Sequence, residues 1–248
     1  MTVTHTTSLR SYPELAYGGY SRCDGNVAFY GRVNALLTPE SHVLDIGCGR
    51  GAFLDDDQAP WRNQLRNFKG RARHVTGIDI DPGAECNPTL DDFKLITDHD
   101  HWPIEDESID LAVSSYVLEH VEHPDAFFSE CSRVMKSGGY ICHATPNKRS
   151  YISIIASLIP NRFHSRITSK VQSNRETEDV FPTFYRCNTK RSIIGSMERA
   201  GFDVVVIRHE AEPSYLHFSK IAYRLGVIAH RLMPPPLAST LLIYGRKR

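Results

Sequence analysis

The sequence lacks the features that mark several large classes of protein. Its 29 basic side chains are balanced by 29 acidic ones, so no net positive charge is present to attract nucleic acid. The six cysteines include no C-x-x-C pair, which favours reduced thiols over a disulfide framework or a zinc site. No stretch is long and apolar enough to span a bilayer, and residues 1–15 lack the apolar core of a secretory signal. These absences predict a cytoplasmic protein with no nucleic-acid partner.

Residues 43–53, VLDIGCGRGAF, form the stretch around which the chain is organised. An apolar run leads into Gly47, Gly49 and Gly51, which predicts a buried strand, a glycine turn and a helix. Glycine lets a ligand lie against the backbone, and a helix start aims free N–H groups at it. For the glycines alone, an ordinary strand–turn–helix junction is the alternative. A dinucleotide-binding fold favours G-x-G-x-x-G, so the G-x-G-x-G spacing argues against a nicotinamide cofactor.

The rest of the chain alternates between strand and helix signals, and 248 residues suffice for one α/β domain with a sizeable core. The predicted strands cover 43–46, 74–82, 93–98, 110–115, 140–145, 202–208 and 241–247, and the predicted helices cover 26–37, 125–135 and 190–200. The helix over 26–37 is interpreted either as a cap over the ligand or as an edge helix packed on the sheet. We expect the helix over 125–135 to stop at Lys136-Ser-Gly-Gly, with Gly138 or Gly139 as its left-handed cap.

Several segments together resemble the class I S-adenosylmethionine-dependent methyltransferases. They are the glycine motif, GID at 77–79, Asp98 five positions before Pro103 (with Trp102 in place of the usual Leu), and ExxRVMKSGGYICHATPN at 130–147. The resemblance is to the small-molecule branch, which includes the ubiquinone-biosynthesis O-methyltransferases. It covers 43–147 well and 189–248 more loosely.

The resemblance implies a doubly wound α/β fold. This Rossmann-like fold has a mostly parallel seven-stranded sheet, helices on both faces, and a last strand antiparallel beside the sixth. We expect one methyltransferase domain over 1–248. Its parts are an N-terminal cap (1–42), a cofactor-binding core (43–147), an acceptor-side insertion (148–188), and a C-terminal part of the sheet with an amphipathic helix (189–248).

The implied cofactor is S-adenosyl-L-methionine. The expected cofactor-binding residues are Asp45, Gly47, Cys48, Gly49, Gly51, Asp79, Ile80, Asp98, His99 and Ser114. Asp79 is the expected ribose acid, because a carboxylate can accept hydrogen bonds from both hydroxyls. Asp81 is instead interpreted as a turn residue before Pro82. The family places an adenine contact at Asp98. No metal is expected, because the H-x-H pair at 99–101 has no evident third ligand.

Glu119 and His120 follow the fourth strand, on the expected acceptor side. A neutral histidine can take a proton from an acceptor hydroxyl, so His120 is the candidate catalytic residue. A packed structural histidine is the alternative. The further acceptor-side candidates are Tyr116, His164, Tyr185 and Arg186. A solvated face explains the charges of the 148–188 segment equally well.

The sequence thus favours a methyltransferase that acts on a small-molecule, sugar or lipid-linked acceptor, at oxygen. The alternatives are a catalytically silent S-adenosylmethionine-binding protein that acts through a partner, and a nicotinamide-dependent oxidoreductase. The identity of the acceptor and the oligomeric state stay open.

Residues 215–233 predict an amphipathic helix. Ile221, Leu225, Ile228 and Leu232 recur at helical spacing, with basic residues off that face. A basic amphipathic helix can make weak contact with a membrane surface. A helix that covers the sheet is the commoner arrangement and is the favoured interpretation.

Overall fold

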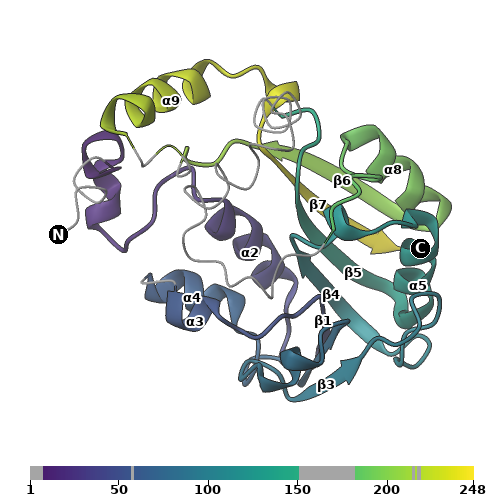
Figure 1. The fold of residues 1–248 in the computed structure, drawn as a ribbon. Helices are drawn as coiled ribbons and strands as arrows, with labels where there is room; N and C mark the ends of the chain where they lie inside the picture. The colour runs from purple at the N-terminus through teal and green to yellow at the C-terminus, as the bar shows by residue number, and fades with distance from the viewer. Residues whose placement is uncertain (1–7, 57–58, 151–181, 214–215, 217–218) are drawn as a thin grey trace.

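A seven-stranded sheet in the order β3-β2-β1-β4-β5-β7-β6 forms the centre of the computed structural model (Figure 1). The structure describes residues 8–56, 59–150, 182–213, 216 and 219–248. The strands are β1 (His42–Ile46), β2 (His74–Asp79), β3 (Asp92–Leu95), β4 (Ile109–Ser115), β5 (Met135–Pro146), β6 (Phe202–His209) and β7 (Thr240–Lys247). Only β7 runs antiparallel to its neighbours, between β5 and β6. The predicted fold, including its antiparallel last strand, is confirmed.

Helices cover both faces of this sheet. The helices of the described residues are α2 (Gly25–Leu36), α3 (Phe53–Asp56), α4 (Pro60–Arg66), α5 (Pro124–Val134) and α8 (Lys190–Arg199), together with α9 (Lys220–Leu232), which lies apart from the sheet. The 3-10 turns are η1 (Pro13–Ala16), η2 (Pro82–Cys86), η3 (Leu118–His120) and η6 (Pro235–Leu237). In the described residues, no helix is long and apolar enough to cross a membrane.

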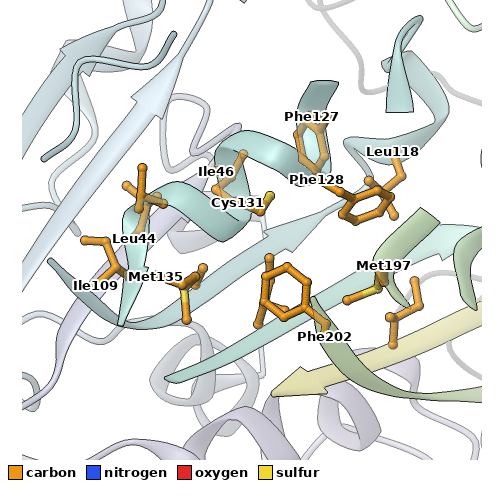
Figure 2. Close-up of a cluster of buried hydrophobic side chains, with 14 of the residues drawn as sticks. Leu44, Ile46, Ile109, Leu118, Phe127, Phe128, Cys131, Met135, Met197 and Phe202 are labelled. Carbon is orange, nitrogen blue, oxygen red and sulfur yellow. The ribbon is translucent and has the colours of Figure 1, made fainter. Parts of the chain in front are cut away.

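Two apolar clusters hold the layers together, one on each face. Leu44 and Ile46 of β1 point into the cluster that contains Phe128 of α5 and Met197 of α8 (Figure 2). Val43, from the same strand, joins the opposite cluster with α2 and α4. Successive side chains of a strand point to opposite faces, so both faces of β1 are apolar apart from His42 at its start and Asp45. The only acid of this central strand is therefore a candidate for function.

Helix α2 packs on the sheet, which agrees with the interpretation of residues 26–37 as an edge helix. Asp24 caps it by accepting a hydrogen bond from the Val27 amide at 2.9 Å. Its buried residues, Phe29, Tyr30 and Val33, lie in the cluster with Val43.

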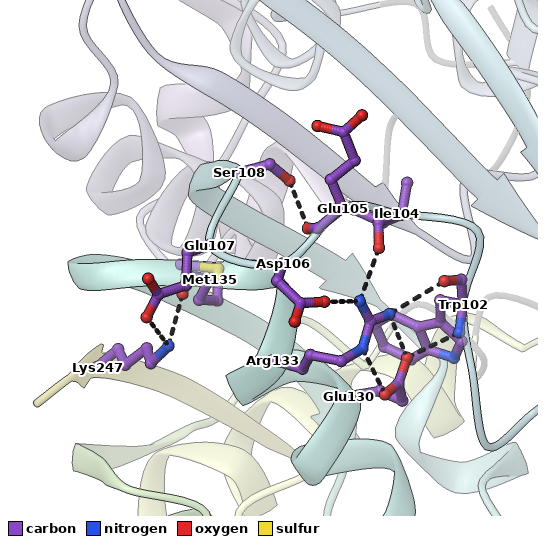
Figure 3. Close-up of polar contacts among 10 residues, drawn as sticks. All are labelled: Trp102, Ile104, Glu105, Asp106, Glu107, Ser108, Glu130, Arg133, Met135 and Lys247. Carbon is purple, nitrogen blue, oxygen red and sulfur yellow. Dashed lines mark hydrogen bonds and ion pairs between the residues drawn. The ribbon is translucent and has the colours of Figure 1, made fainter.

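A buried ion cluster fixes the loop between β3 and β4 against α5 (Figure 3). Arg133 donates to Glu130 and Asp106 and to the carbonyls of Trp102 and Ile104. Glu130 also accepts from the Trp102 amide at 2.7 Å. Burial opposes ionisation of Glu130, but hydrogen bonds from Arg133 and this amide hold its pKa below the ordinary value. The ExxR part of the family motif therefore positions the loop that carries Asp98.

The predicted ends of the third strand and of the helix over 125–135 are wrong. Strand β3 ends at Leu95 and not at Asp98, because its partner β2 ends at Asp79, whose carbonyl accepts the last ladder bond from the Ile96 amide. The helix after the glycine turn is a single four-residue turn, α3. Helix α5 ends at Val134, and β5 starts at once. Gly138 takes its positive φ of 79° inside β5, near a register shift against β4.

The favoured interpretation of 215–233 is also wrong. The buried residues of α9, which include Tyr223 and Val227, pack against Tyr12 and Leu15 of the N-terminal segment. That cluster is separate from the two clusters on the sheet. The helix therefore covers the N-terminal segment, and its apolar stripe lies on the outside.

Candidate functional site

The glycine turn after β1 curves through three residues with positive φ angles. Gly47, Gly49 and Gly51 have φ angles of 67°, 54° and 76°, a region that glycine enters at little cost. A Cβ on Gly47 would lie 2.4 Å from Val117, and one on Gly51 would lie 2.6 Å from Asn87. A Cβ on Gly49 would meet no described atom within 4 Å. The turn is thus tightly packed at both ends, with open space at its centre for a ligand.

Asn87 and Asp79 hold this turn in place. Asn87 is buried, and its side-chain amide donates to the carbonyls of Cys48 and Gly49, each at 3.0 Å. Asp79 accepts from the Gly49 amide at 2.9 Å. The sequence analysis did not single out Asn87. Its Asn-Pro dipeptide is a turn signal, but the contact spans about forty residues and has no local pattern.

The second strand ends beside this turn, at the carboxyl edge of the sheet, where ligands bind in such folds. Asp79 is nearly buried and also accepts from the Asp81 amide at 2.9 Å. Each of its oxygens therefore has one backbone donor, and an ionised carboxylate offers about four acceptor positions. Capacity for two further donors is left. Ile80, the next residue, exposes 46% of its surface, which suits the flat face of a base.

Asp81 has a different role from Asp79. It accepts from Gly83 and pairs with Arg50 at 2.9 Å, so it caps η2 and joins that turn to the glycine turn. Hydrogen bonds from the Gly83 amide and from Arg50 lower the pKa of Asp81. 

Asp98 and His99 lie on the exposed loop after β3. Asp98 accepts from the Asp100 amide at 2.9 Å, which shapes the loop as a turn. The backbone bond from Ile96 to Asp79 brings this loop to the end of β2. The structure therefore brings the loop of Asp98 to the same edge as the glycine turn.

Asp45 lies on β1 on the α2 side of the sheet. Burial raises its pKa to about 7, and the charge of Asp79 adds to this, while Arg66 opposes it. Arg66 also lies over the ring of Tyr30, 5.8 Å from its centroid. A half-buried acid with a pKa near neutrality, two residues before the glycine turn, is typical of a functional site.

The side chains of two predicted cofactor residues, Ser114 and Cys48, point into the protein. Ser114 is fully buried, and its hydroxyl is hydrogen-bonded to Nδ1 of His143 at 2.6 Å. Its side chain thus supports the sheet on the face away from Asp45, and the expected ligand contact is wrong for that side chain. Cys48 lies within the turn, where burial raises its thiol pKa, and its Sγ would lie 2.8 Å from a Cβ on Gly77.

The acceptor-side candidates come together beyond β4. The amides of Phe184 and Tyr185 donate to the Glu119 carbonyl at 2.8 and 3.1 Å, which joins η3 to the last residues of the 148–188 insertion. Nδ1 of His120 is hydrogen-bonded to the Pro182 carbonyl at 2.8 Å. A carbonyl can only accept, so Nδ1 carries the proton and the neutral ring has its lone pair on Nε2. In this tautomer Nε2 is the ring nitrogen that can accept a proton.

A buried polar chain lies beneath His120. Thr145 donates to Glu119 at 3.0 Å, and the Asn188 amide donates to Thr145 at 2.6 Å. All three residues are buried, so the chain ties η3, β5 and the 182–188 segment together. The sequence analysis noted Glu119 but missed both partners.

Two tyrosines flank this region in a strained backbone conformation. Tyr116 has a φ of 60° and Tyr185 a φ of 51°, a left-handed region that is costly for such residues. Tyr116 is 47% exposed at the carboxyl end of β4. Burial, with the charge of Glu119, raises the pKa of Tyr185. Arg186 is exposed, and His164 lies outside the described residues.

A groove between two helices does not belong to this site. A groove of about 810 Å³ lies between α5 and α8, lined by residues that include Glu107 and Lys247. Glu107 precedes β4 and Lys247 ends the antiparallel β7, so the groove is at the opposite edge of the sheet.

Among the described residues, no group of three or more His, Cys, Asp or Glu side chains is placed to hold a metal ion.

Comparison with known proteins gives a consistent result. Residues 20–207 match the model of a methyltransferase domain family. An S-adenosylmethionine-dependent methyltransferase of Mycolicibacterium smegmatis is 30% identical over 58% of this chain and 55% of its own length. A ubiquinone biosynthesis O-methyltransferase of Hahella chejuensis is 30% identical over 44% of this chain and 45% of its own. The chain thus spans about half the length of these curated relatives.

A solved structure shows the same fold. The S-adenosylmethionine-dependent methyltransferase of Archaeoglobus fulgidus matches with a TM-score of 0.54 at 20% identity, over 94% of this chain and 97% of its own.

Proposed function

Because the chain belongs to the class I S-adenosylmethionine-dependent methyltransferase family, we propose that it transfers a methyl group from S-adenosylmethionine to an oxygen of its acceptor. The observation that carries this proposal is the open centre of the glycine turn, at Gly49, beside the buried carboxylate of Asp79. We infer that the acceptor is a small molecule, a sugar or a lipid-linked compound, and the name of one curated relative, a ubiquinone biosynthesis O-methyltransferase, supports methylation at oxygen.

The residues of the carboxyl edge fit this cofactor. Asp79 would accept hydrogen bonds from both ribose hydroxyls, since it keeps acceptor capacity beside its two backbone donors. Ile80 would lie against the adenine ring, and the loop of Asp98 would reach its amino group. Asp45, when ionised, suits the α-ammonium of the methionine part. When bound, the cofactor would supply an electrophilic methyl group on a sulfonium. The acceptor oxygen would bond to this methyl carbon as the carbon–sulfur bond breaks.

The protein's own part in the chemistry is positioning and proton removal. In-line displacement requires the oxygen, the methyl carbon and the sulfur to be aligned and water to be excluded. His120, with its proton on Nδ1, would take the acceptor's proton at Nε2 as the new bond forms. The buried chain from Glu119 to Asn188 would keep η3 fixed while this happens. The segment 148–188 is proposed to shape the acceptor side, with Tyr116, Tyr185 and Arg186 toward the acceptor.

The test is incubation of the protein with methyl-labelled S-adenosylmethionine and a metabolite extract, followed by mass analysis of labelled products. We expect one class of product that carries the label on oxygen. The Asp79→Ala variant should yield far less labelled product at the same cofactor concentration, because its cofactor affinity is lower. Tight cofactor binding without any labelled product would favour the catalytically silent alternative. Label on nitrogen or carbon would contradict the assignment of oxygen.

A further inference from the structure

Helix α9 carries an apolar stripe that faces away from the molecule. Ile221, Leu225, Ile228 and Leu232 are 73%, 62%, 54% and 78% exposed. Their spacing of three and four residues places them on one side of the helix. The buried side, through Tyr223, packs on the N-terminal segment. Figure 1 shows α9 at the periphery, so this stripe is a continuous outward surface.

Three cations lie along one flank of this stripe. Lys220, Arg224 and Arg231 are exposed. At 3.6 residues per turn they fall between the stripe and the buried side, all on the same flank. Helix α9 contains no acidic residue, whereas the whole chain has a formal net charge of +0. The helix is therefore a local positive region beside an apolar one.

The acids next to α9 are engaged elsewhere. Glu210 lies 3.1 Å from His230, on the buried side of the helix. Glu14 of η1 pairs with Arg22 at 3.6 Å. Burial raises the pKa of Glu212, which is half-buried near Ser21. Among the described residues, Arg231 lies within the electrostatic reach of Glu14, whereas Lys220 and Arg224 are exposed and form no ion pair with a described acid.

We propose that α9 docks on a membrane surface that contains anionic lipids. The apolar stripe would insert at the boundary between headgroups and acyl chains, and the three cations would contact lipid phosphates. An apolar face flanked by cations matches both parts of such a surface. A protein partner for the stripe would have to be both apolar and acidic.

The position of α9 gives this contact a consequence for the site. The helix leads into η6, and Asn147 at the carboxyl end of β5 donates to the carbonyls of Pro236 and Ala238 at 3.1 and 2.8 Å. A docked α9 would therefore keep the carboxyl edge of the sheet near the lipid surface. The docking itself does not depend on the proposed chemistry, since it can be measured without cofactor or acceptor.

The test is cosedimentation of the full chain with vesicles of phosphatidylcholine, with or without phosphatidylglycerol. Binding should require phosphatidylglycerol and fall as salt is raised. The double variant Arg224→Gln/Arg231→Gln should bind about twentyfold more weakly, at about fivefold for each charge near an anionic surface. Leu225→Gln/Ile228→Gln should lose at least about tenfold, because apolar side chains no longer insert.

Val205→Thr is the matched control, because Val205 is 61% exposed on β6, away from α9. It should bind vesicles like the wild type, and the melting temperatures of all variants should agree. Equal binding to both kinds of vesicle, no binding, or full binding by Leu225→Gln/Ile228→Gln would overturn the proposal. So would a dimer in light scattering that dissociates in that variant, because a second copy would then cover the stripe.

Discussion

Replacement of Asp79 tests the cofactor site most closely. In Asp79→Ala, two expected hydrogen bonds from ribose hydroxyls to a charged acceptor disappear, together with the 2.9 Å bond that holds the Gly49 amide. Hydrogen bonds to charged groups contribute about 1.5–3 kcal/mol each. Ribose regains water on release, so we expect a net loss of about 3 kcal/mol, or roughly a hundredfold in affinity. Asp79→Asn keeps one acceptor oxygen, so its cofactor affinity should fall between the affinities of the wild type and of Asp79→Ala.

Asp81→Ala is the matched control, two residues away. Its ion pair with Arg50 is partly exposed, and such pairs contribute about 0–1 kcal/mol. Its cap of η2 adds about 1 kcal/mol, which appears as stability. Calorimetric titration with S-adenosylhomocysteine should therefore give nearly wild-type affinity, with a lower melting temperature. A larger affinity loss in Asp81→Ala than in Asp79→Ala would refute the assignment and move the ribose contact to Asp81.

Three other residues give predictions of their own. Asn87→Ala should weaken S-adenosylhomocysteine binding at least about tenfold in the same titration, because the carbonyls of two turn residues lose their donor. Unchanged affinity would show that the turn keeps its conformation without Asn87. The raised pKa of Asp45, about 7, means that ionising this acid disfavours the folded state. Denaturation of the free protein should therefore show stability falling by about 2–4 kcal/mol from pH 4 to pH 7, and Asp45→Asn should remove that fall. His120→Gln should lower turnover by about 10²–10⁴ with cofactor affinity unchanged, whereas lost thermal stability with normal turnover would mean a structural role.

The sheet could be predicted from the sequence because its signals are local. Each strand is an apolar run of a few residues, and the glycine motif marks the junction at which the ligand site forms. The boundaries that failed depend on distant partners. Strand β3 stops where its partner β2 ends, at Asp79, and no window around Leu95 records where that partner ends.

The support of the site could not be predicted for the same reason. Asn87 holds a turn about forty residues before it, and Asn188 reaches Thr145 across a similar separation. Polar residues of these types occur in many loops, so only the fold distinguishes them. Ser114 shows the converse, since its place at the end of β4 suggested a ligand contact, but its side chain points into the sheet.

Helix α9 shows a limit of periodicity. The pattern of its apolar residues predicts one apolar face, and the helix indeed has one. The pattern does not say whether that face turns inward. Here Tyr223 and Val227, from the other side, pack against the N-terminal segment, and the stripe is left outside.

The central claim is that the glycine turn binds S-adenosylmethionine, and the most direct measurement is the thermal shift of the protein with two ligands. At a hundred times its dissociation constant, S-adenosylhomocysteine should add about 2.7 kcal/mol of stability. That corresponds to a rise of several degrees in melting temperature for a chain of this size, and the Asp79→Ala protein should lose most of it. NADH should leave the melting temperature unchanged. A shift with NADH that exceeds the shift with S-adenosylhomocysteine would contradict the account.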